Sequence, residues 1–125
     1  MSPLARAIYA ILRQRASRPE PRITYGELAR QLRASSGKLK AIHHRSRPLY
    51  AALNEIGREC RRLHLPALPA LVVRADTRRP GKAYFVGRCV AGEPRDRSVA
   101  AWWREVEAVK QTRYPPDLTA EEGNS

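Results

Sequence analysis

The alternation of apolar and polar positions predicts a long third helix around which the chain is organised. From Ser46 to Leu63, apolar residues recur at steps of four and three, which places them on one narrow face of a helix. These are Leu49, Leu53, Ile56, Cys60 and Leu63. Ser46 or Arg47 is the expected N-cap, and a proline in the following first turn loses only a donor that would be unpaired anyway. Pro66 prevents the helix from continuing.

The opposite face of this helix is polar and mostly cationic. Asn54, Arg58 and Arg61 fall there, flanked by Ala51 and Arg62. One apolar edge and one guanidinium-rich edge fit an ordinary surface helix as well as a helix that contacts a polyanion. The rest of the chain has to separate these two readings.

Three other segments show helical spacing. Ser2 caps a first helix that runs to about Ala16, and Thr24 with Glu27 forms a capping box for a second helix that ends near residues 33–34. A last helix is expected from about residue 98 to 112. It contains Trp102 and Trp103, which cannot share one face, so one should enter the core and the other should cover a loop or meet a partner.

Beyond Pro66 the pattern changes to that of β-structure. Ala70–Ala75 and Ala83–Gly87 read as two strands joined by the turn-rich, basic connector Asp76–Lys82. Three helices followed by a hairpin is the order of a winged helix. We therefore expect a mainly α fold with a small β-hairpin: a winged helix-turn-helix-like domain in residues 1–91. A C-terminal helix in residues 92–114 and a disordered tail in residues 115–125 should follow.

Charge is the strongest global signal. The 125 residues carry 24 Lys and Arg against 12 Asp and Glu, a net charge of +12. Residues 1–91 hold 19 basic and 5 acidic side chains, whereas residues 92–125 hold 5 and 7. An arginine-rich composition alone would spread these charges evenly, so the imbalance favours a polyanion partner, most often nucleic acid.

No catalytic or metal-binding pattern is visible. Cys60 and Cys89 lack partners at zinc-ligand spacing and suit reduced, buried thiols in a cytoplasmic protein, with a disulfide between them as the lesser alternative. Side chains of adjacent residues rarely point at one metal ion. His43 and His44 are therefore expected to be solvated or to contact phosphate rather than to bind a metal. Glu55 and Glu59, one turn apart, should pair with Arg58 and Arg62 of the same helix. We expect neither a cofactor nor an enzymatic activity, and no apolar run approaches the length of a membrane span.

The segment Ile23–Ala29, with the sequence Ile-Thr-Tyr-Gly-Glu-Leu-Ala, resembles the DNA-binding domain of the O6-alkylguanine-DNA alkyltransferases and their catalytically silent relatives. The order of elements is similar over roughly residues 1–87. The resemblance implies that Tyr25 presses on a DNA phosphate beside a flipped nucleotide and that Arg47 fills the vacated stack. The family's acceptor motif, Pro-Cys-His-Arg, is absent, because the comparable stretch is Pro69–Val73. Alkyl transfer is therefore not expected.

These patterns give a set of candidate nucleic-acid contacts. Asn54, Arg58 and Arg61 can read base edges, although Tyr50 and Ala51 lie nearer the helix start, which usually sits deepest in the groove. The expected phosphate contacts are Lys38, Lys40, Arg45, Arg47, Arg78, Arg79 and Lys82. If five to seven such contacts form on duplex DNA, log K should fall against log salt with a slope of roughly −4 to −6.

Two other readings remain open. The chain could be a small basic protein-interaction module, such as a phage or mobile-element inhibitor or an accessory subunit, with a partner at the Trp102/Trp103 region. It could also bind RNA, since winged helices dock on RNA by shape. Binding assays with duplex DNA, single strands and structured RNA at matched salt separate these alternatives.

Overall fold

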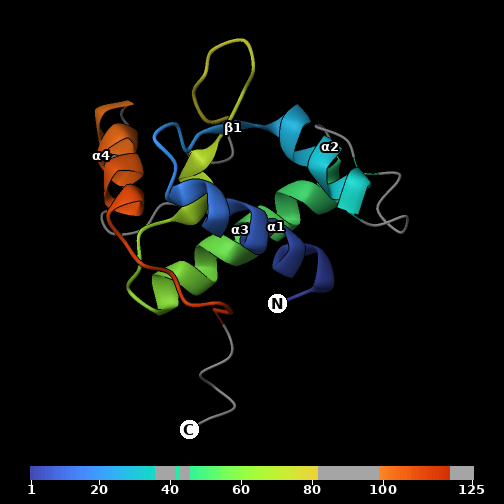
Figure 1. Ribbon diagram of the computed structural model, residues 1–125, viewed down its shortest axis with the longest axis horizontal. Coiled ribbons are helices and arrows are strands. Elements are labelled where there is room, and N and C mark those ends of the chain that lie inside the picture. Colours follow the sequence, from blue (N-terminus) through green and yellow to red (C-terminus); the bar gives the residue numbers. More distant parts are fainter. Residues whose placement is uncertain (36–41, 43–45, 82–98, 119–125) are drawn as a thin grey trace, which may run out of the picture.

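Four α-helices, one short 3₁₀ helix and two short strands make up the part of the chain that the computed structural model describes, residues 1–35, 42, 46–81 and 99–118 (Figure 1). In chain order they are α1 (Pro3–Ala16), β1 (Ile23–Thr24), α2 (Tyr25–Ser35), α3 (Arg47–Arg62), η2 (Leu68–Leu71), β2 (Val72–Val73) and α4 (Val99–Lys110). The fold is mainly α with a small β element, as the sequence predicts. None of the described helices has the length and apolar character needed to span a bilayer.

The core forms where α1 packs across α3 and both contact η2 (Figure 1). The apolar stripe predicted for α3 is buried except at Leu63, which is partly buried, and Leu49, Ile56 and Cys60 are fully excluded from solvent. Burial also raises the pKa of the Cys60 thiol to about 11, so this cysteine is a packed, protonated side chain. Cys89 lies outside the described residues.

The first two helices begin where their caps predict. The Ser2 hydroxyl accepts a hydrogen bond from the Ala5 amide at 3.1 Å, and the Thr24 hydroxyl accepts one from the Glu27 amide at 3.0 Å. Each bond satisfies one of the amides that a helix leaves unpaired in its first turn. Both capping bonds join residues within one helical turn, so the start of α1 and of α2 agrees with the local sequence signal.

The end of α3 is set by backbone geometry before Pro66 is reached. His64 adopts a left-handed conformation with φ of 58°. Its amide donates to the Arg61 carbonyl at 3.1 Å, and the Leu65 amide donates to the Cys60 carbonyl at 2.8 Å. This is a Schellman motif, in which a residue with positive φ closes the last turn.

The β element differs from the expected hairpin. β1 and β2 pair in parallel, with Ile23 opposite Val72 and Thr24 opposite Val73. Leu68–Leu71 forms the 3₁₀ helix η2, so the strand expected over residues 70–75 is reduced to two residues. The predicted second strand, residues 83–87, lies outside the described residues, and the hairpin itself stays a prediction.

The helix expected near residues 98–112 is α4, and the segment after it is folded onto the body. Trp102 is the core tryptophan, and its indole N–H donates to the Ala70 carbonyl at 2.8 Å. The Tyr114 hydroxyl donates to the Pro66 carbonyl at 2.6 Å. Leu118 is 0% exposed, so the expected start of a disordered tail at residue 115 is wrong by at least four residues. Leu118 follows two prolines and an aspartate, so no periodic apolar pattern in the sequence predicts its burial.

Candidate nucleic-acid interface

The outer face of α3 carries the charges that the sequence places there. Arg47, Arg58 and Arg61 are exposed and Asn54 is partly exposed. At 100° per residue these positions fall within one stripe opposite Leu49 and Ile56. With a rise of 1.5 Å per residue, the stripe extends about 20 Å from Arg47 to Arg61.

The two acids of α3 lie on its flank and are engaged there. A Glu59 carboxylate oxygen lies 2.9 Å from an Arg62 nitrogen. Glu55 instead accepts a hydrogen bond from the Ser2 amide at 3.0 Å and lies 3.8 Å from the terminal amine, so its expected pairing with Arg58 is not the one the structure has. The outer stripe of α3 therefore contains no acid of its own helix.

Two predicted tyrosines meet at the start of α3. The ring centroids of Tyr25 and Tyr50 are 5.4 Å apart. A Cβ placed on Gly81 would lie 3.4 Å from the Tyr25 hydroxyl oxygen, so the backbone after β2 closes over this ring. Tyr25 is only 9% exposed, which leaves little more than its edge for the phosphate contact that the family resemblance implies.

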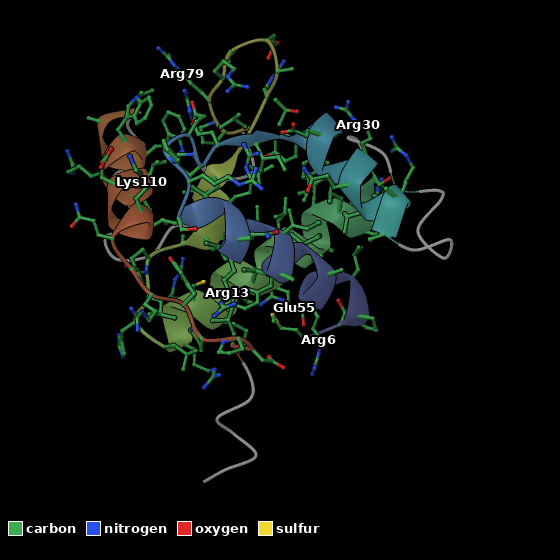
Figure 2. All side chains as sticks on the ribbon, in the orientation of Figure 1. Arg6, Arg13, Arg30, Glu55, Arg79 and Lys110 are labelled. Carbon is green, nitrogen blue, oxygen red and sulfur yellow. The ribbon has the colours of Figure 1, made fainter. Side chains whose placement is uncertain are left out.

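The loop after β2 carries further arginines and projects from the body (Figure 1). The Arg74 amide donates to the Arg79 carbonyl at 2.8 Å, which closes the loop, and Arg78 occupies it with φ of 58°. The Arg74 side chain pairs with Asp76 at 2.8 Å. Arg79 is exposed and lies on this projecting loop (Figure 2).

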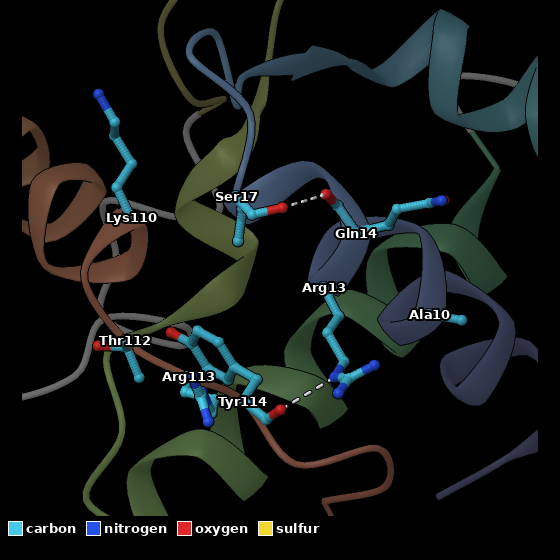
Figure 3. Close-up of a pocket in the computed structure, with 9 residues that line it drawn as sticks. Ala10, Arg13, Gln14, Ser17, Lys110, Thr112, Arg113 and Tyr114 are labelled. Atoms are coloured by element: carbon cyan, nitrogen blue, oxygen red, sulfur yellow. Dashed lines mark hydrogen bonds between the residues drawn. The ribbon is translucent and has the colours of Figure 1, made fainter.

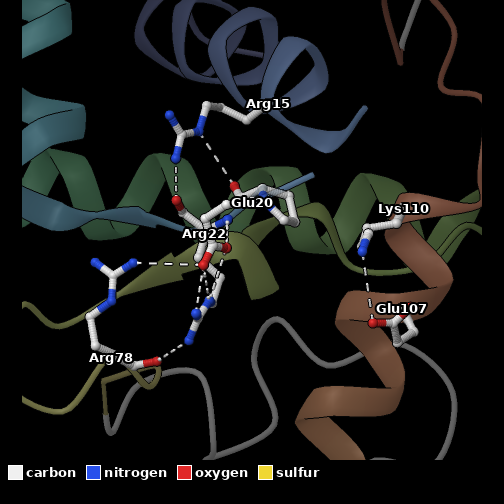
Figure 4. Close-up of polar contacts among 7 residues, drawn as sticks. Arg15, Glu20, Arg22, Arg78, Glu107 and Lys110 are labelled. Atoms are coloured by element: carbon white, nitrogen blue, oxygen red, sulfur yellow. Dashed lines mark hydrogen bonds and ion pairs between the residues drawn. The ribbon is translucent and has the colours of Figure 1, made fainter. Parts of the chain in front are cut away.

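Sequence reasoning missed a second cluster, which we call the Glu20 cluster: Glu20, Arg22, Arg78 and Trp103. Glu20 lies 2.6 Å from an Arg22 guanidinium nitrogen and 3.9 Å from one of Arg78 (Figure 4). The Arg22 hydrogen bond lowers the pKa of the Glu20 carboxyl to about 2. Trp103 is 42% exposed, and the Arg22 guanidinium lies 5.0 Å from the centroid of its ring. The sequence predicts Arg78 as a phosphate contact and one exposed ring in the Trp102–Trp103 pair, but not that these side chains meet at Glu20.

A cavity of about 450 Å³ lies elsewhere, between the ends of α1 and α4 (Figure 3). Arg13, Lys110 and Arg113 line it, and the Arg13 Nε donates to the Tyr114 carbonyl at 2.9 Å. Two helix C-termini converge here, and their partial negative charge favours cations. These basic residues therefore have a structural explanation and do not by themselves indicate a ligand.

Basic side chains also occur on other sides of the molecule. Arg6, Arg30, Arg79 and Lys110 lie at well-separated positions in Figure 2. Total charge therefore does not define one binding face, and what distinguishes the α3 stripe is that it contains no acid of its own helix. Four predicted contacts, Lys38, Lys40, Arg45 and Lys82, lie outside the described residues, as do His43 and His44.

Within the described part of the chain, no three His, Cys, Asp or Glu side chains lie close enough together to hold a metal ion. Comparison of the chain with protein-family models, curated proteins and solved structures finds no match.

Proposed function

We propose that this protein is a non-catalytic nucleic-acid-binding protein that contacts duplex DNA through the outer face of α3 and the loop after β2. The observation that carries the proposal is the separation of charge on α3. Its outer stripe presents Arg47, Arg58 and Arg61, while both of its acids are engaged on the flank. A surface helix that served only solubility would gain most from acids and bases interleaved on its outer face.

The size of the stripe suits a duplex. The major groove of B-DNA is about 12 Å wide and admits one α-helix, while the flanking phosphates remain within reach of long side chains. Arg58 and Asn54 can reach base edges, and Arg47 lies at the helix start, where phosphate contacts fix the orientation. Arg79 adds an exposed cation on the loop after β2. Localisation of the binding to α3 is also what the resemblance to alkyltransferase DNA-binding domains implies. We propose that relationship at the level of the winged helix alone.

The test is binding of labelled duplex DNA, single-stranded DNA and structured RNA at one salt concentration, measured by fluorescence anisotropy. The Arg58→Ala/Arg61→Ala double variant removes two charges from the outer stripe. The matched control, Arg6→Ala/Arg113→Ala, removes two exposed arginines from α1 and from the segment after α4. We expect duplex DNA to bind best and only the stripe variant to lose affinity. Equal losses in both variants would show that net charge alone drives binding.

A second candidate function rests on Trp103, the one large apolar side chain that is exposed among the described residues. An exposed tryptophan beside arginine is typical of the centre of a protein–protein interface. On this reading the chain is a protein-interaction module. Retention of a protein partner by wild type and its loss in Trp103→Ala, with duplex binding undetectable at low salt, would favour it over DNA binding.

A further inference from the structure

The Glu20 carboxylate is surrounded by donors that come from two loops. Arg22 donates to it through the guanidinium at 2.6 Å and through its own backbone amide at 3.1 Å. The Arg78 guanidinium, from the loop after β2, lies 3.9 Å away on the other side (Figure 4). Guanidinium groups and a backbone amide that converge on two oxygens form the kind of donor set by which proteins hold phosphate.

Arg22 is held in position by contacts that do not involve Glu20. Its backbone carbonyl accepts a hydrogen bond from the Arg15 guanidinium. Its own guanidinium donates to the Arg78 carbonyl at 3.3 Å and lies over the Trp103 ring. The site would therefore keep most of its geometry if the carboxylate left.

The Glu20 side chain can leave Arg22 and Arg78 with little loss of stability. Its side chain is 51% exposed and stands between two prolines on the loop that joins α1 to β1. Exposed ion pairs contribute little to stability, because water and salt replace the partner readily. Arg22 and Arg78 would then face each other as like charges, which favours the entry of another anion.

We propose that Arg22 and Arg78 form a phosphate-binding site that Glu20 occupies in the free protein and that a phosphodiester of bound nucleic acid takes over. This inference rests on the proposed function. It makes Glu20 an internal competitor that weakens non-specific binding of polyanions, and it extends the interface from the loop after β2 towards Trp103. The exchange is one of ionic partners and breaks no covalent bond.

The test compares Glu20→Gln with Glu107→Gln. Glu107 pairs with Lys110 at 3.9 Å on the exposed side of α4, so both variants lose one exposed, ion-paired acid (Figure 4). We expect Glu20→Gln to tighten duplex binding about two- to fivefold, the range that loss of a competing exposed pair allows. The slope of log K against log salt should steepen by up to about 1. Equal affinities and slopes in the two variants would overturn the proposal.

A second readout does not depend on nucleic acid. Because Arg22 lies over Trp103, tripolyphosphate bound at this site should change the Trp103 emission in Glu20→Gln, and less so after addition of Arg78→Ala. The Trp103→Phe variant, in which Trp102 is the one remaining tryptophan, shows whether the emission change comes from Trp103. An emission change without duplex binding would keep the phosphate site and overturn the proposed function. If duplex DNA binds, the emission does not change, and Glu20→Gln and Glu107→Gln behave alike, the proposed function stands and the phosphate site is overturned.

Discussion

Replacement of Leu118 by alanine tests whether the segment after α4 belongs to the folded body. Leu118 is fully buried in the same core as α1 and α3. Burial of a leucine side chain contributes about 1.5–3 kcal/mol, and Leu→Ala changes in cores cost about 2–5 kcal/mol once the cavity is included.

The segment around Leu118 is held at several points, so the cavity should not collapse. Asp117 pairs with Arg6 at 3.2 Å, the Leu118 carbonyl accepts a hydrogen bond from Arg62 at 3.4 Å, and the Tyr9 hydroxyl donates to the Pro115 carbonyl. We therefore expect a loss of about 3 kcal/mol in the free energy of unfolding, near the middle of the range for buried leucines.

Urea unfolding followed by tryptophan fluorescence measures this loss as a shift of the midpoint at constant m. Asp117→Ala is the control, because an exposed ion pair contributes at most about 1 kcal/mol. A Leu118→Ala protein within about 0.5 kcal/mol of wild type, the range of ordinary surface substitutions, would refute the placement of this residue in the core.

Three further outcomes follow from local geometry and from pKa shifts, and urea midpoints measure each. His64→Gly should raise stability by about 0.5–1 kcal/mol, because glycine adopts the left-handed conformation of the α3 C-terminus without strain; a loss would contradict the Schellman assignment. The Glu105 carboxylate accepts a hydrogen bond from the Ala67 amide at 2.6 Å, and burial raises the pKa of this carboxyl. The free energy of unfolding should therefore fall as pH rises through that pKa. Glu105→Gln keeps an oxygen acceptor for the Ala67 amide and should remove this loss of stability with rising pH. A variant whose stability depends on pH as wild type does would refute the assignment to Glu105. Glu20 has the opposite shift, to about 2, so its contribution is present above pH 4.5 and is lost as pH falls towards 2. Glu20→Gln should abolish that acid-dependent loss, which stays below about 1 kcal/mol for so exposed a pair.

Local rules predicted the helices of this protein well. Ser2 and Thr24 cap α1 and α2 through the expected hydrogen bonds, and the buried stripe of α3 follows from its spacing alone. Caps and periodicity depend on neighbours within a few residues, so a sequence displays them directly. The exposure of Arg58 and Arg61 follows from the same periodicity.

Contacts between distant segments were not predictable in this way. The parallel pairing of β1 with β2 joins two-residue strands almost fifty residues apart, too short to show a strand pattern. The Glu20 cluster brings together the loop before β1, the loop after β2 and α4, and no local pattern in any of them shows that they meet. Only the folded arrangement shows that Arg22 and Arg78 face the same carboxylate.

The salt dependence of duplex binding tests the central claim most directly. If the outer stripe of α3 and the loop after β2 bind phosphates, log K of wild type should fall with log salt at a slope of roughly −4 to −6. Arg58→Ala/Arg61→Ala should then bind at least about tenfold more weakly, with a slope shallower by up to about 1.8 if both arginines contact phosphates. Wild-type binding that is insensitive to salt, or a stripe variant that matches wild type in affinity and slope, would contradict the account.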